Sequence, residues 1–408
     1  MNKNKMDVVM IGLGYIGLPT ATLIANNKSH VLGVDINQRV VDTINSGKIH
    51  IVEPSLDLAV ENAVKNGFLR AAIKPKKANT YIIVVPTPFK GNHEPDISYV
   101  KSATQSIIPL LKENDLYIIE STSPVGTTEK MMAYIYSERP ELKNKLHIAY
   151  CPERVLPGNV MFELVNNDRV IGGVNEKSTK KAIAFYKKYV KGKLHETNAR
   201  TAEMCKLVEN SSRDVQIAFA NELSLICDKA NINVWELINL ANKHPRVNIL
   251  NPGAGVGGHC IAVDPYFIVN DFPKEAKIIK AARDINNYKS DWCIEKIKNT
   301  ALEFQLKNKK KPTIALMGLA FKPNIDDLRE SPAKYIASEI IKNTNLGNFT
   351  ISEPNIKTHP NFTIINHKEA VKNADIIVFL VAHNEYKNLE ISKKSIILDF
   401  CGVRNLIN

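Results

Sequence analysis

A cysteine and an aspartate stand four residues apart in the glycine-rich stretch GVGGHCIAVDP, residues 255–265. Cys260 could close a disulfide, bind a metal, fill a small apolar gap or attack a substrate. A metal site needs three or four ligands, and beyond His259, Cys260 and Asp264 no partner spacing is evident, so no metal is predicted. The cysteines also contain no CxxC pair, which argues against a disulfide framework and a thiolate zinc site: Cys151, Cys205, Cys227, Cys260, Cys293 and Cys401.

A second group of chemistry-bearing residues is the turn GLGYIG, directly after the apolar run DVVMI. Its glycines fit GxGxxG, in which the first permits a tight turn, the second admits a pyrophosphate and the third allows close helix–strand packing. Asp35 follows Gly17 by 18 residues, at the end of the next expected strand, where an acid suits the adenosine ribose. That acid repels a 2′-phosphate and favours NAD over NADP, although the nearby Arg39 weakens the distinction. The predicted cofactor-binding residues here are Gly12, Gly14, Tyr15, Ile16, Gly17, Asp35 and Arg39.

A nicotinamide cofactor changes the interpretation of Cys260. The glycines at 253, 255, 257 and 258 indicate that another group approaches the backbone closely. Beside a nicotinamide, a nucleophilic thiolate is the leading interpretation, and Lys206 is a candidate for the positive charge that stabilises it. Such a cysteine can trap an aldehyde as a thiohemiacetal, lose a second hydride to give a thioester, and release an acid after hydrolysis. This logic predicts a four-electron oxidation of an alcohol to a carboxylate.

Three segments are expected to position these residues. Apolar runs such as TYIIVVPTP suit strands buried on both faces of a parallel sheet, so residues 1–199 are predicted to form a Rossmann-like doubly wound domain. From Arg200 to about Asn231 the chain lacks Pro and Gly and repeats apolar residues at helical spacing, which predicts a long spine helix. Lys206 and Asn210 are four apart and share one face of it. Residues 200–305 are predicted to form this helical spine and dimerisation region with the cysteine loop, including helical patterns at VWELINLANKH and from Lys274 to about Phe304.

The C-terminal third repeats the opening plan. PTIALMGLAFKPN, DIIVFLVAH and SIILDFCGV echo DVVMIGLGYIG, TYIIVVPTP and LYIIEST in order and type. Residues 306–408 are therefore predicted to form a second Rossmann-like domain, giving an α/β fold of two doubly wound domains joined by a helical spine. Its turn GLAFKP lacks the second and third glycines, so we expect a ligand other than the first dinucleotide.

Composition limits the partners. The 408 residues are 44% hydrophobic and 24% charged, as in a soluble globular protein, and the longest apolar runs are too short to span a bilayer. MNKNKMDVVMIGLG leaves no room for a signal peptide, so a cytoplasmic location is expected. The net charge of +12 includes short basic clusters, KPKK and KNKKK, without interleaved aromatics. These predict solvated loops and no nucleic-acid or membrane partner, while the positive balance suits an anionic small substrate.

Several ordered blocks resemble the UDP-glucose/GDP-mannose dehydrogenase family over nearly the whole chain. They are VMIGLGYIGLPTA, VPTPFKGNHEPD, ESTSPVGTTEK, CPERVLPGN, RTAEMCKLVENSSRD, HPRVNILNPGAGVGGHCIAVDP and GLAFKPNIDDLRESP. The resemblance implies that Cys260 is the covalent nucleophile and that Asp264 helps to activate water. It implies that Lys206 and Asn210 stabilise oxyanions or assist proton transfer, with Glu153 near the hydrolytic water.

The resemblance also implies contacts with the ligands. Thr122 would lie near the nicotinamide and a bound water, Thr87 would contact the cofactor, and Arg329 would reach the cofactor from the C-terminal domain. Lys322 would bind the nucleotide-sugar, and Arg246 would reach it across a homodimer interface made by the spine helices. The predicted substrate-binding residues are Glu153, Arg154, Lys206, Asn210, Arg246, Asn248, Gly257 and Lys322. Plainer roles stay open from the residues alone: Glu153 could pair with Arg154, and Arg329 with Asp326 or Asp327.

One departure bears on the substrate. UDP-glucose dehydrogenases usually carry a lysine just before the loop aspartate, whereas this chain has CIAVDP, whose Ala262–Val263 pair resembles the N-acetylhexosamine branch. CPERVLPGN and NNDRVIGG resemble the branch that acts on UDP-N-acetyl-mannosamine more than the glucosamine enzymes. The resulting hypothesis is oxidation of that sugar's primary alcohol to the uronate with two NAD. The alternatives are oxidation of UDP-N-acetyl-glucosamine and a non-catalytic sensor of NAD or nucleotide-sugar.

Overall fold

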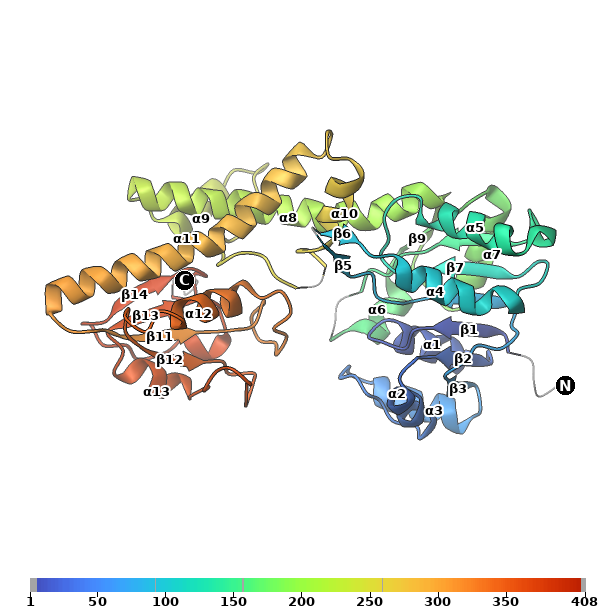
Figure 1. Cartoon of the computed structure of the whole chain (residues 1–408), viewed down its shortest axis with the longest axis horizontal. Helices are drawn as coiled ribbons and strands as arrows, with labels where there is room; N and C mark the ends of the chain where they lie inside the picture. The colour runs from blue at the N-terminus through green and yellow to red at the C-terminus, as the bar shows by residue number, and fades with distance from the viewer. Residues whose placement is uncertain (1–5, 92, 156–157, 259, 405–408) are drawn as a thin grey trace. The chain divides into compact units, whose positions relative to one another are not determined.

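The computed structural model describes residues 6–91, 93–155, 158–258 and 260–404. The chain divides into two compact units, Met1–Val208 and Glu209–Asn408. The 32-residue helix α8 (Ala199–Ala230) contains the boundary between them (Figure 1). The long helix predicted from the absence of Pro and Gly is thus present, within one residue of its expected ends.

An eight-stranded sheet forms the centre of the first unit within the described residues, in the order β10-β9-β8-β7-β4-β1-β2-β3. Its pairings are parallel except for a two-residue antiparallel contact between β8 and β9. The strands are β1 (Val8–Ile11), β2 (Val31–Val34), β3 (Leu69–Ala72), β4 (Thr80–Ile83), β7 (Leu116–Ile119), β8 (His147–Tyr150), β9 (Arg169–Gly173) and β10 (Leu194–Asn198). The reversal at β9 brings its first residue, Arg169, to the edge of the sheet where β7 and β8 end.

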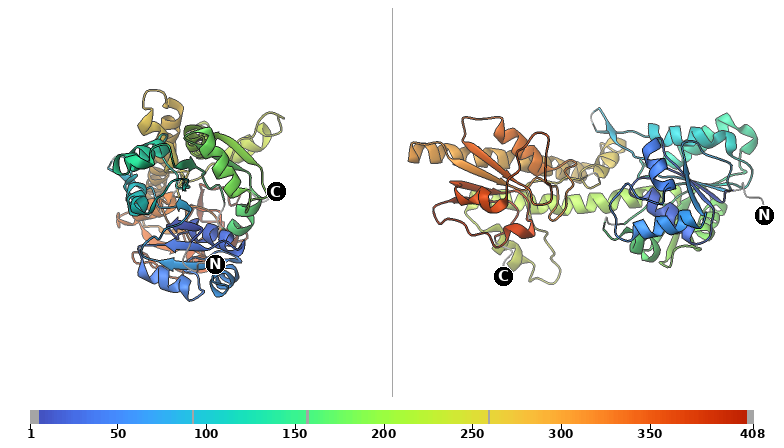
Figure 2. Two further views of the ribbon diagram at one scale, coloured as in Figure 1. Left: turned by 90° about the vertical axis from the view of Figure 1, so that its right-hand side faces the viewer. Right: turned by 90° about the horizontal axis from the view of Figure 1, so that it is seen from below.

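Apolar side chains cover both faces of this sheet, as the unbroken apolar runs predict. On β1, Val8 and Met10 belong to one buried core and Val9 and Ile11 to the other. Helices flank the sheet on both sides (Figure 2): α1 (Gly17–Asn26), α2 (Gln38–Asn45), α3 (Leu56–Lys65) and α7 (Glu176–Tyr186) contribute to the first core, and α4 (Ser98–Ile107) and α5 (Thr127–Glu138) to the second. The unit also contains α6 (Val160–Asn166), the turns η1 (Ile108–Leu110) and η2 (Pro140–Leu142), and the ribbon β5 (Phe89–Lys90) with β6 (Glu94–Pro95).

The second unit contains a four-stranded parallel sheet in the order β12-β11-β13-β14. Its strands are β11 (Thr313–Met317), β12 (Asn348–Ser352), β13 (Ile376–Phe379) and β14 (Ile396–Asp399). The long helix α11 (Lys277–Asn308) and α12 (Pro332–Ile341) share the core on one face, and α13 (His367–Lys372) shares the core on the other, near the turn η3 (Asn384–Tyr386). Between α8 and α11 lie α9 (Val234–Ala241) and α10 (Asp264–Asp271).

Candidate active site

The glycine turn of the first unit follows β1 and leads into α1. Gly12 has φ +97°, and a Cβ there would lie 2.1 Å from the Val84 carbonyl oxygen. A Cβ on Gly17 would lie 1.9 Å from the Gly12 carbonyl oxygen, so the helix and the turn need both glycines. A Cβ on Gly14 would meet nothing within 4 Å, and the N-cap residue of α1, Ile16, provides no side-chain hydrogen bond to the first turn of the helix. The turn therefore leaves open backbone at the helix N-terminus, as pyrophosphate binding requires.

Asp35 closes the turn from the end of β2. Its Oδ2 accepts from the Leu13 backbone N–H at 3.2 Å, and its Oδ1 accepts from the Asn37 N–H at 2.9 Å. Each carboxylate oxygen keeps a further lone pair, and the residue is only half-buried, so it remains able to accept from a ribose hydroxyl. Arg39 is exposed in the first turn of α2, and Tyr15 is exposed beside Gly14. No sequence motif singles out His50, which lies near the Asp35 charge and hydrogen-bonds the Leu13 backbone. Partial burial lowers the pKa of His50, although both of these contacts act to raise it.

Thr87 and Thr122 lie together where β4 and β7 end. The Thr87 hydroxyl donates to the Thr122 carbonyl at 2.7 Å, which joins the two predicted cofactor segments. The loop after Thr122 is held by Glu203 of α8, a fully buried carboxylate that accepts from the N–H groups of Gly126 at 2.5 Å and Thr128 at 2.8 Å. Glu203 therefore supplies the side-chain acceptor that the N-terminus of α5 lacks in its own sequence.

Glu153 is buried just beyond β8, and its carboxylate pairs with Arg169. Glu153 Oε2 lies 2.6 Å from Arg169 Nη2, while Glu153 Oε1 accepts from the Arg154 backbone N–H at 2.7 Å. The Arg154 side chain donates instead to the Asp168 carbonyl at 2.6 Å. The alternative of a surface ion pair with Arg154 is thus wrong for Glu153, because β9 brings the Arg169 guanidinium to it inside the protein. No sequence pattern near CPER indicates that Glu153 pairs with Arg169, which lies 16 residues later.

Asn210, Cys260 and Asp264 come together in the second unit. Asp264 is the first residue of α10 and is buried, and its Oδ2 accepts from the Asn210 amide of α8 at 2.5 Å. The backbone N–H groups of Val263 and Asp264 donate to the Cys260 carbonyl at 3.0 and 2.8 Å, so the cysteine and the aspartate share one tight turn. Lys206 precedes Asn210 by one turn of α8 and is half-buried. His259 lies outside the described residues, and the side chains of Ala262 and Val263 are buried.

The glycines before Cys260 are required by the protein itself. A Cβ on Gly255 would lie 2.5 Å from Ser290 Oγ, and one on Gly257 would lie 2.5 Å from the Glu330 carbonyl oxygen. Gly258 has φ +84°, and its Cβ would lie 2.9 Å from the Phe321 ring. The groups that approach the backbone of these glycines closely are therefore residues 321–332 and α11. At these three positions, protein packing accounts for glycine without any ligand.

The remaining predicted residues of the second unit lie in loops. Arg329 forms a bidentate ion pair with Asp327, with Nη2 to Oδ2 at 2.6 Å, in agreement with the plainer of its two roles. Lys322 is exposed in the loop after β11. Arg246 and Asn248 are exposed in a loop that Asn242 closes through hydrogen bonds to the Ile249 backbone at 2.7 and 3.0 Å.

The second sheet has a counterpart of the glycine turn, with its acid already occupied. Gly318 has φ +102°, and Glu353, at the end of β12, accepts from the N–H groups of Leu319 at 2.8 Å and Ala320 at 3.0 Å. Glu353 also pairs with the fully buried His383 at 3.1 Å. Hydrogen bonds to backbone and to His383 lower the pKa of Glu353 although burial opposes them. Unlike Asp35, Glu353 is buried, so its carboxylate is not available to accept from a ribose hydroxyl. We therefore still expect a ligand other than the first dinucleotide at this turn.

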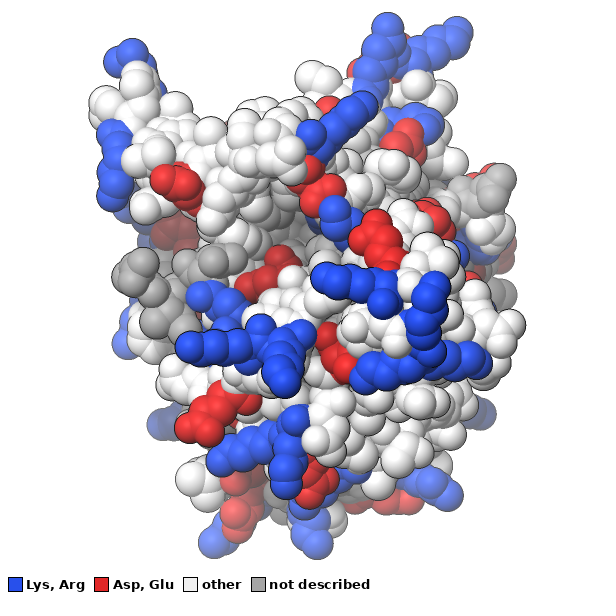
Figure 3. All heavy atoms as spheres, turned by 90° about the vertical axis from the view of Figure 1, so that its left-hand side faces the viewer, with Lys and Arg blue, Asp and Glu red and all other residues white. Residues whose placement is uncertain are grey.

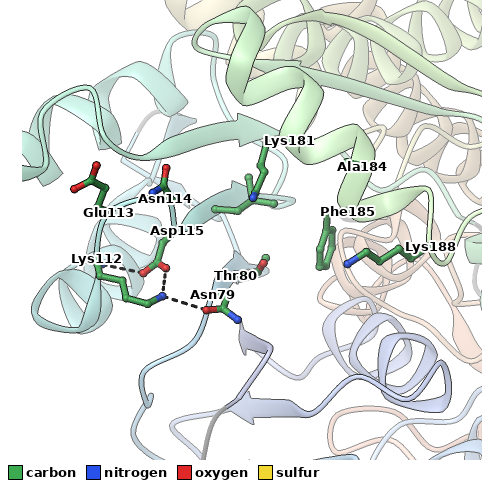
Figure 4. Close-up of a pocket in the computed structure, with 11 residues that line it drawn as sticks. Asn79, Thr80, Lys112, Glu113, Asn114, Asp115, Lys181, Ala184, Phe185 and Lys188 are labelled. Carbon is green, nitrogen blue, oxygen red and sulfur yellow. Dashed lines mark hydrogen bonds and ion pairs between the residues drawn. The ribbon is translucent and has the colours of Figure 1, made fainter.

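A further pocket and a charged face, both formed by described residues, add no candidate chemistry. A pocket at the amino ends of β4 and β7 is lined by Lys181 of α7, by Lys188 just after that helix and by Lys112, which bonds Asp115 and Asn79 (Figure 4). It lies at the sheet edge opposite the predicted site residues. On the face drawn in Figure 3, Lys and Arg are distributed among Asp and Glu side chains. Within the described residues, no three His, Cys, Asp or Glu side chains are grouped to hold a metal ion, and no helix has the length and apolar character to cross a bilayer.

The doubly wound sheets and the open glycine turn with its acid define a dinucleotide-binding α/β protein of the dehydrogenase type. Three domain profiles of the UDP-glucose/GDP-mannose dehydrogenase family match: the NAD binding domain at residues 6–190, the central domain at 200–288 and the UDP binding domain at 315–405. The chain belongs to this family and is an NAD-dependent nucleotide-sugar dehydrogenase.

Individual relatives are similar over nearly their whole length. UDP-N-acetyl-D-mannosamine dehydrogenase of Escherichia coli K12 is 54% identical over 396 residues, covering 93% of this chain and 94% of the relative. NDP-N-acetyl-D-galactosaminuronic acid dehydrogenase of Ralstonia nicotianae is 49% identical, covering 97% and 96%. The solved UDP-D-ManNAc dehydrogenase of Pyrococcus horikoshii has a TM-score of 0.87 and 38% identity, covering 98% and 96%. The predicted fold class is confirmed.

Proposed function

We propose that the chain oxidises the primary alcohol of UDP-N-acetyl-D-mannosamine to the carboxylate, with two NAD per turnover. The observation that carries the proposal is the tight turn joining Cys260 to Asp264, with Asn210 bonded to the aspartate. It occurs in a chain 54% identical to a UDP-N-acetyl-D-mannosamine dehydrogenase. A nucleophile and a carboxylate held one turn apart suit formation and hydrolysis of a covalent acyl intermediate.

The first unit fits NAD. The open backbone at Gly14 and the N-terminus of α1 suit its pyrophosphate, and the half-buried Asp35 suits its ribose. Thr87 and Thr122, joined by a hydrogen bond at the ends of β4 and β7, are the residues we assign to the nicotinamide end. When bound, NAD supplies the hydride acceptor for both oxidations.

The chain's own residues carry the remaining chemistry. A base removes the proton of the alcohol as hydride leaves carbon, and the Cys260 thiolate adds to the resulting aldehyde to give a thiohemiacetal. A second hydride leaves that carbon, and the base takes the hydroxyl proton, which gives a thioester. Water, activated by Asp264 or Glu153, then displaces the thiolate and forms the acid. Lys206 and Asn210 stabilise the oxyanions of these steps.

We assign the organisation of the chain to three segments. Residues 1–199 hold NAD, residues 200–305 carry the cysteine loop and the dimer contact, and residues 306–408 bind the nucleotide through Lys322. The exposure of Lys322 and the UDP binding profile at 315–405 support the last assignment. Arg329 is assigned to the cofactor, and Arg154, Arg246, Asn248 and Gly257 to the sugar nucleotide.

A homodimer is part of the proposal. Val208, Phe219 and Ile226 are 43%, 52% and 56% exposed on α8. Their spacings of 11 and 7 residues place them on one face of the helix. An exposed apolar stripe of this kind suits contact with the same stripe of a second chain.

The proposal is tested by incubating the purified chain and NAD separately with UDP-N-acetyl-mannosamine, UDP-N-acetyl-glucosamine and UDP-glucose. We expect the mannosamine compound to react best, with two NADH formed per sugar. One NADH would identify a plain alcohol dehydrogenase, and none with any sugar a binding protein. A preference for UDP-glucose would overturn the interpretation of CIAVDP.

The covalent step is tested with Cys260→Ser. The serine variant should release uronate at least about a thousandfold more slowly, because a hydroxyl is a far weaker nucleophile than a thiolate. Cys205→Ser, a half-buried cysteine of α8, is the matched control and should keep the parent rate. Uronate release by Cys260→Ser at the parent rate would show that no cysteine adduct is needed.

A further inference from the structure

Two buried carboxylates in the first unit share one guanidinium. Arg169 Nη2 lies 2.6 Å from Glu153 Oε2, and Arg169 Nη1 lies 3.8 Å from Glu120 Oε1. Glu120 follows β7 directly and its side chain is fully buried. Tyr186 of α7 donates to Glu120 Oε1 at 2.5 Å and lies under the Arg169 guanidinium, 5.0 Å from ring centre to Cζ. Cys151, 3.8 Å from Arg169 Nη1, completes the cluster.

The charges of this cluster balance only when one carboxylate is protonated. The Oε2 atoms of Glu120 and Glu153 both have no hydrogen-bond partner among the described residues, but Glu153 Oε2 lies 2.6 Å from Arg169 Nη2. The contact of Glu120 with Arg169 is longer, at 3.8 Å between Oε1 and Nη1, so Glu153 is the carboxylate that the guanidinium neutralises more strongly. Burial raises the pKa of Glu120 to about 7, Arg169 opposes the rise and the Glu153 charge adds to it. Burial also raises the pKa of the Cys151 thiol to about 12, so Cys151 contributes no charge near neutrality. Protonated Glu120 leaves one cation and one anion, and ionised Glu120 leaves a buried net charge of −1.

We propose that Glu120 is a positioning residue for Glu153 that acts through Arg169. Protonated Glu120 leaves the guanidinium to Glu153 alone, and ionised Glu120 competes for it. This inference rests on the proposed function, in which Glu153 lies near the hydrolytic water. Glu120 itself need not touch substrate or cofactor, because the effect is transmitted through the shared cation.

The competition between Glu120 and Glu153 for Arg169 predicts how the rate of acid formation changes with pH. When Glu120 ionises, the positive charge of Arg169 is divided between two carboxylates, and the Glu153 carboxylate is less neutralised. A less neutralised carboxylate is a stronger proton acceptor, so acid formation from the Cys260 thioester should accelerate as pH rises through about 7. Glutamine at position 120 keeps the acceptor for Tyr186 and stays neutral at every pH.

The test measures the single-turnover rate of acid formation between pH 6 and 9 for the parent chain and Glu120→Gln. We expect similar rates at pH 6, and a rate roughly three- to tenfold lower in Glu120→Gln at pH 8.5, with KM unchanged. Tyr186→Phe removes the hydrogen bond that favours the Glu120 carboxylate, so it should move the inflection to higher pH. Glu141→Gln, an exposed glutamate paired with Arg139, should follow the parent profile.

Unfolding provides a readout that is independent of turnover. Because its folded pKa is raised, Glu120 contributes stability that is present below about pH 4.5 and is lost as pH rises through about 7. The Tm advantage of Glu120→Gln over the parent should therefore grow between pH 5 and 8. A parent chain that yields two NADH while Glu120→Gln keeps the parent pH profile would overturn this inference alone. A chain that oxidises no sugar nucleotide would overturn the proposed function, and this inference with it.

Discussion

At the level of a single residue, Lys289 shows how burial changes the protonation of a side chain that belongs to no sequence motif. Its side chain is fully buried in the second unit, where Nζ donates to Ser224 Oγ at 2.7 Å and lies 3.9 Å from the centre of the Trp292 ring. Burial lowers its pKa to about 8, although Cys293 and Asp228 oppose the shift. In the sequence, Lys289 is an ordinary lysine of a long helix.

Lys289→Met should stabilise the protein at pH 7. The charged form is disfavoured in the folded chain, so the unfolded chain holds more protons between about pH 8 and 10.5, and parent stability rises with pH across that window. Methionine removes this penalty but loses the Ser224 hydrogen bond, which leaves a net gain of about 1–2 kcal/mol at pH 7. Unfolding in urea at pH 7 and pH 10 measures it. The gain should shrink at the higher pH, and a variant that is less stable at both values would contradict this account.

At the level of elements, α8 stabilises a loop that is distant from it in the sequence. The Glu203 carboxylate accepts hydrogen bonds from the backbone N–H groups at the start of α5, and α5 follows the loop containing Thr122. Glu203 precedes Lys206 by three residues on α8, but its hydrogen-bond partners lie about 75 residues earlier in the chain. The helix therefore organises the carboxyl edge of the first sheet as well as carrying Lys206.

Glu203→Gln should destabilise the first unit by about 1–3 kcal/mol, because an amide cannot accept at both of the positions that the carboxylate oxygens occupy. Glu222→Gln, at an exposed position of the same helix, is the control and should change stability by less than about 0.5 kcal/mol. Thermal unfolding at pH 7 compares the two. Equal Tm values for both variants would show that the hydrogen bonds of Glu203 do not support α5.

At the level of the whole molecule, the exposed stripe of α8 is the feature that points to assembly. Phe219 is 52% exposed in the middle of a 32-residue helix, whereas most large apolar residues of the chain are buried. A surface helix of one chain rarely keeps such a stripe without a partner.

Phe219→Glu should convert the proposed homodimer to single chains, since a charge at the centre of a self-complementary contact meets its own copy. Phe162→Glu, a similarly exposed phenylalanine of α6 in the first unit, is the matched control and should leave the mass unchanged. Sedimentation velocity measures the mass of both variants. A parent chain that already sediments as a single chain would remove the dimer from the proposal.

Local patterns were sufficient for the fold class and for most of the elements. The unbroken apolar runs predicted a buried parallel sheet, and the stretch without Pro or Gly predicted α8, because helix and strand periodicities are properties of neighbouring residues. The spacing of Gly12, Gly14 and Gly17 predicted the dinucleotide turn for the same reason. The antiparallel contact of β9 was not predicted, because strand direction depends on how the chain returns to the sheet.

The sequence by itself determined the chemistry available: a cysteine four residues before an aspartate, a glycine turn with its acid, and a lysine and an asparagine on one helix face. Only the tertiary structure decided which groups meet. It paired Glu153 with Arg169, placed Glu120 beside them, and assigned the glycines before Cys260 to contacts with Phe321, Ser290 and the Glu330 backbone. The physical reason is that burial and long-range packing set the dielectric surroundings and the interaction partners of each group. Neither the surroundings nor the partners can be inferred from the residues adjacent to that group in the sequence.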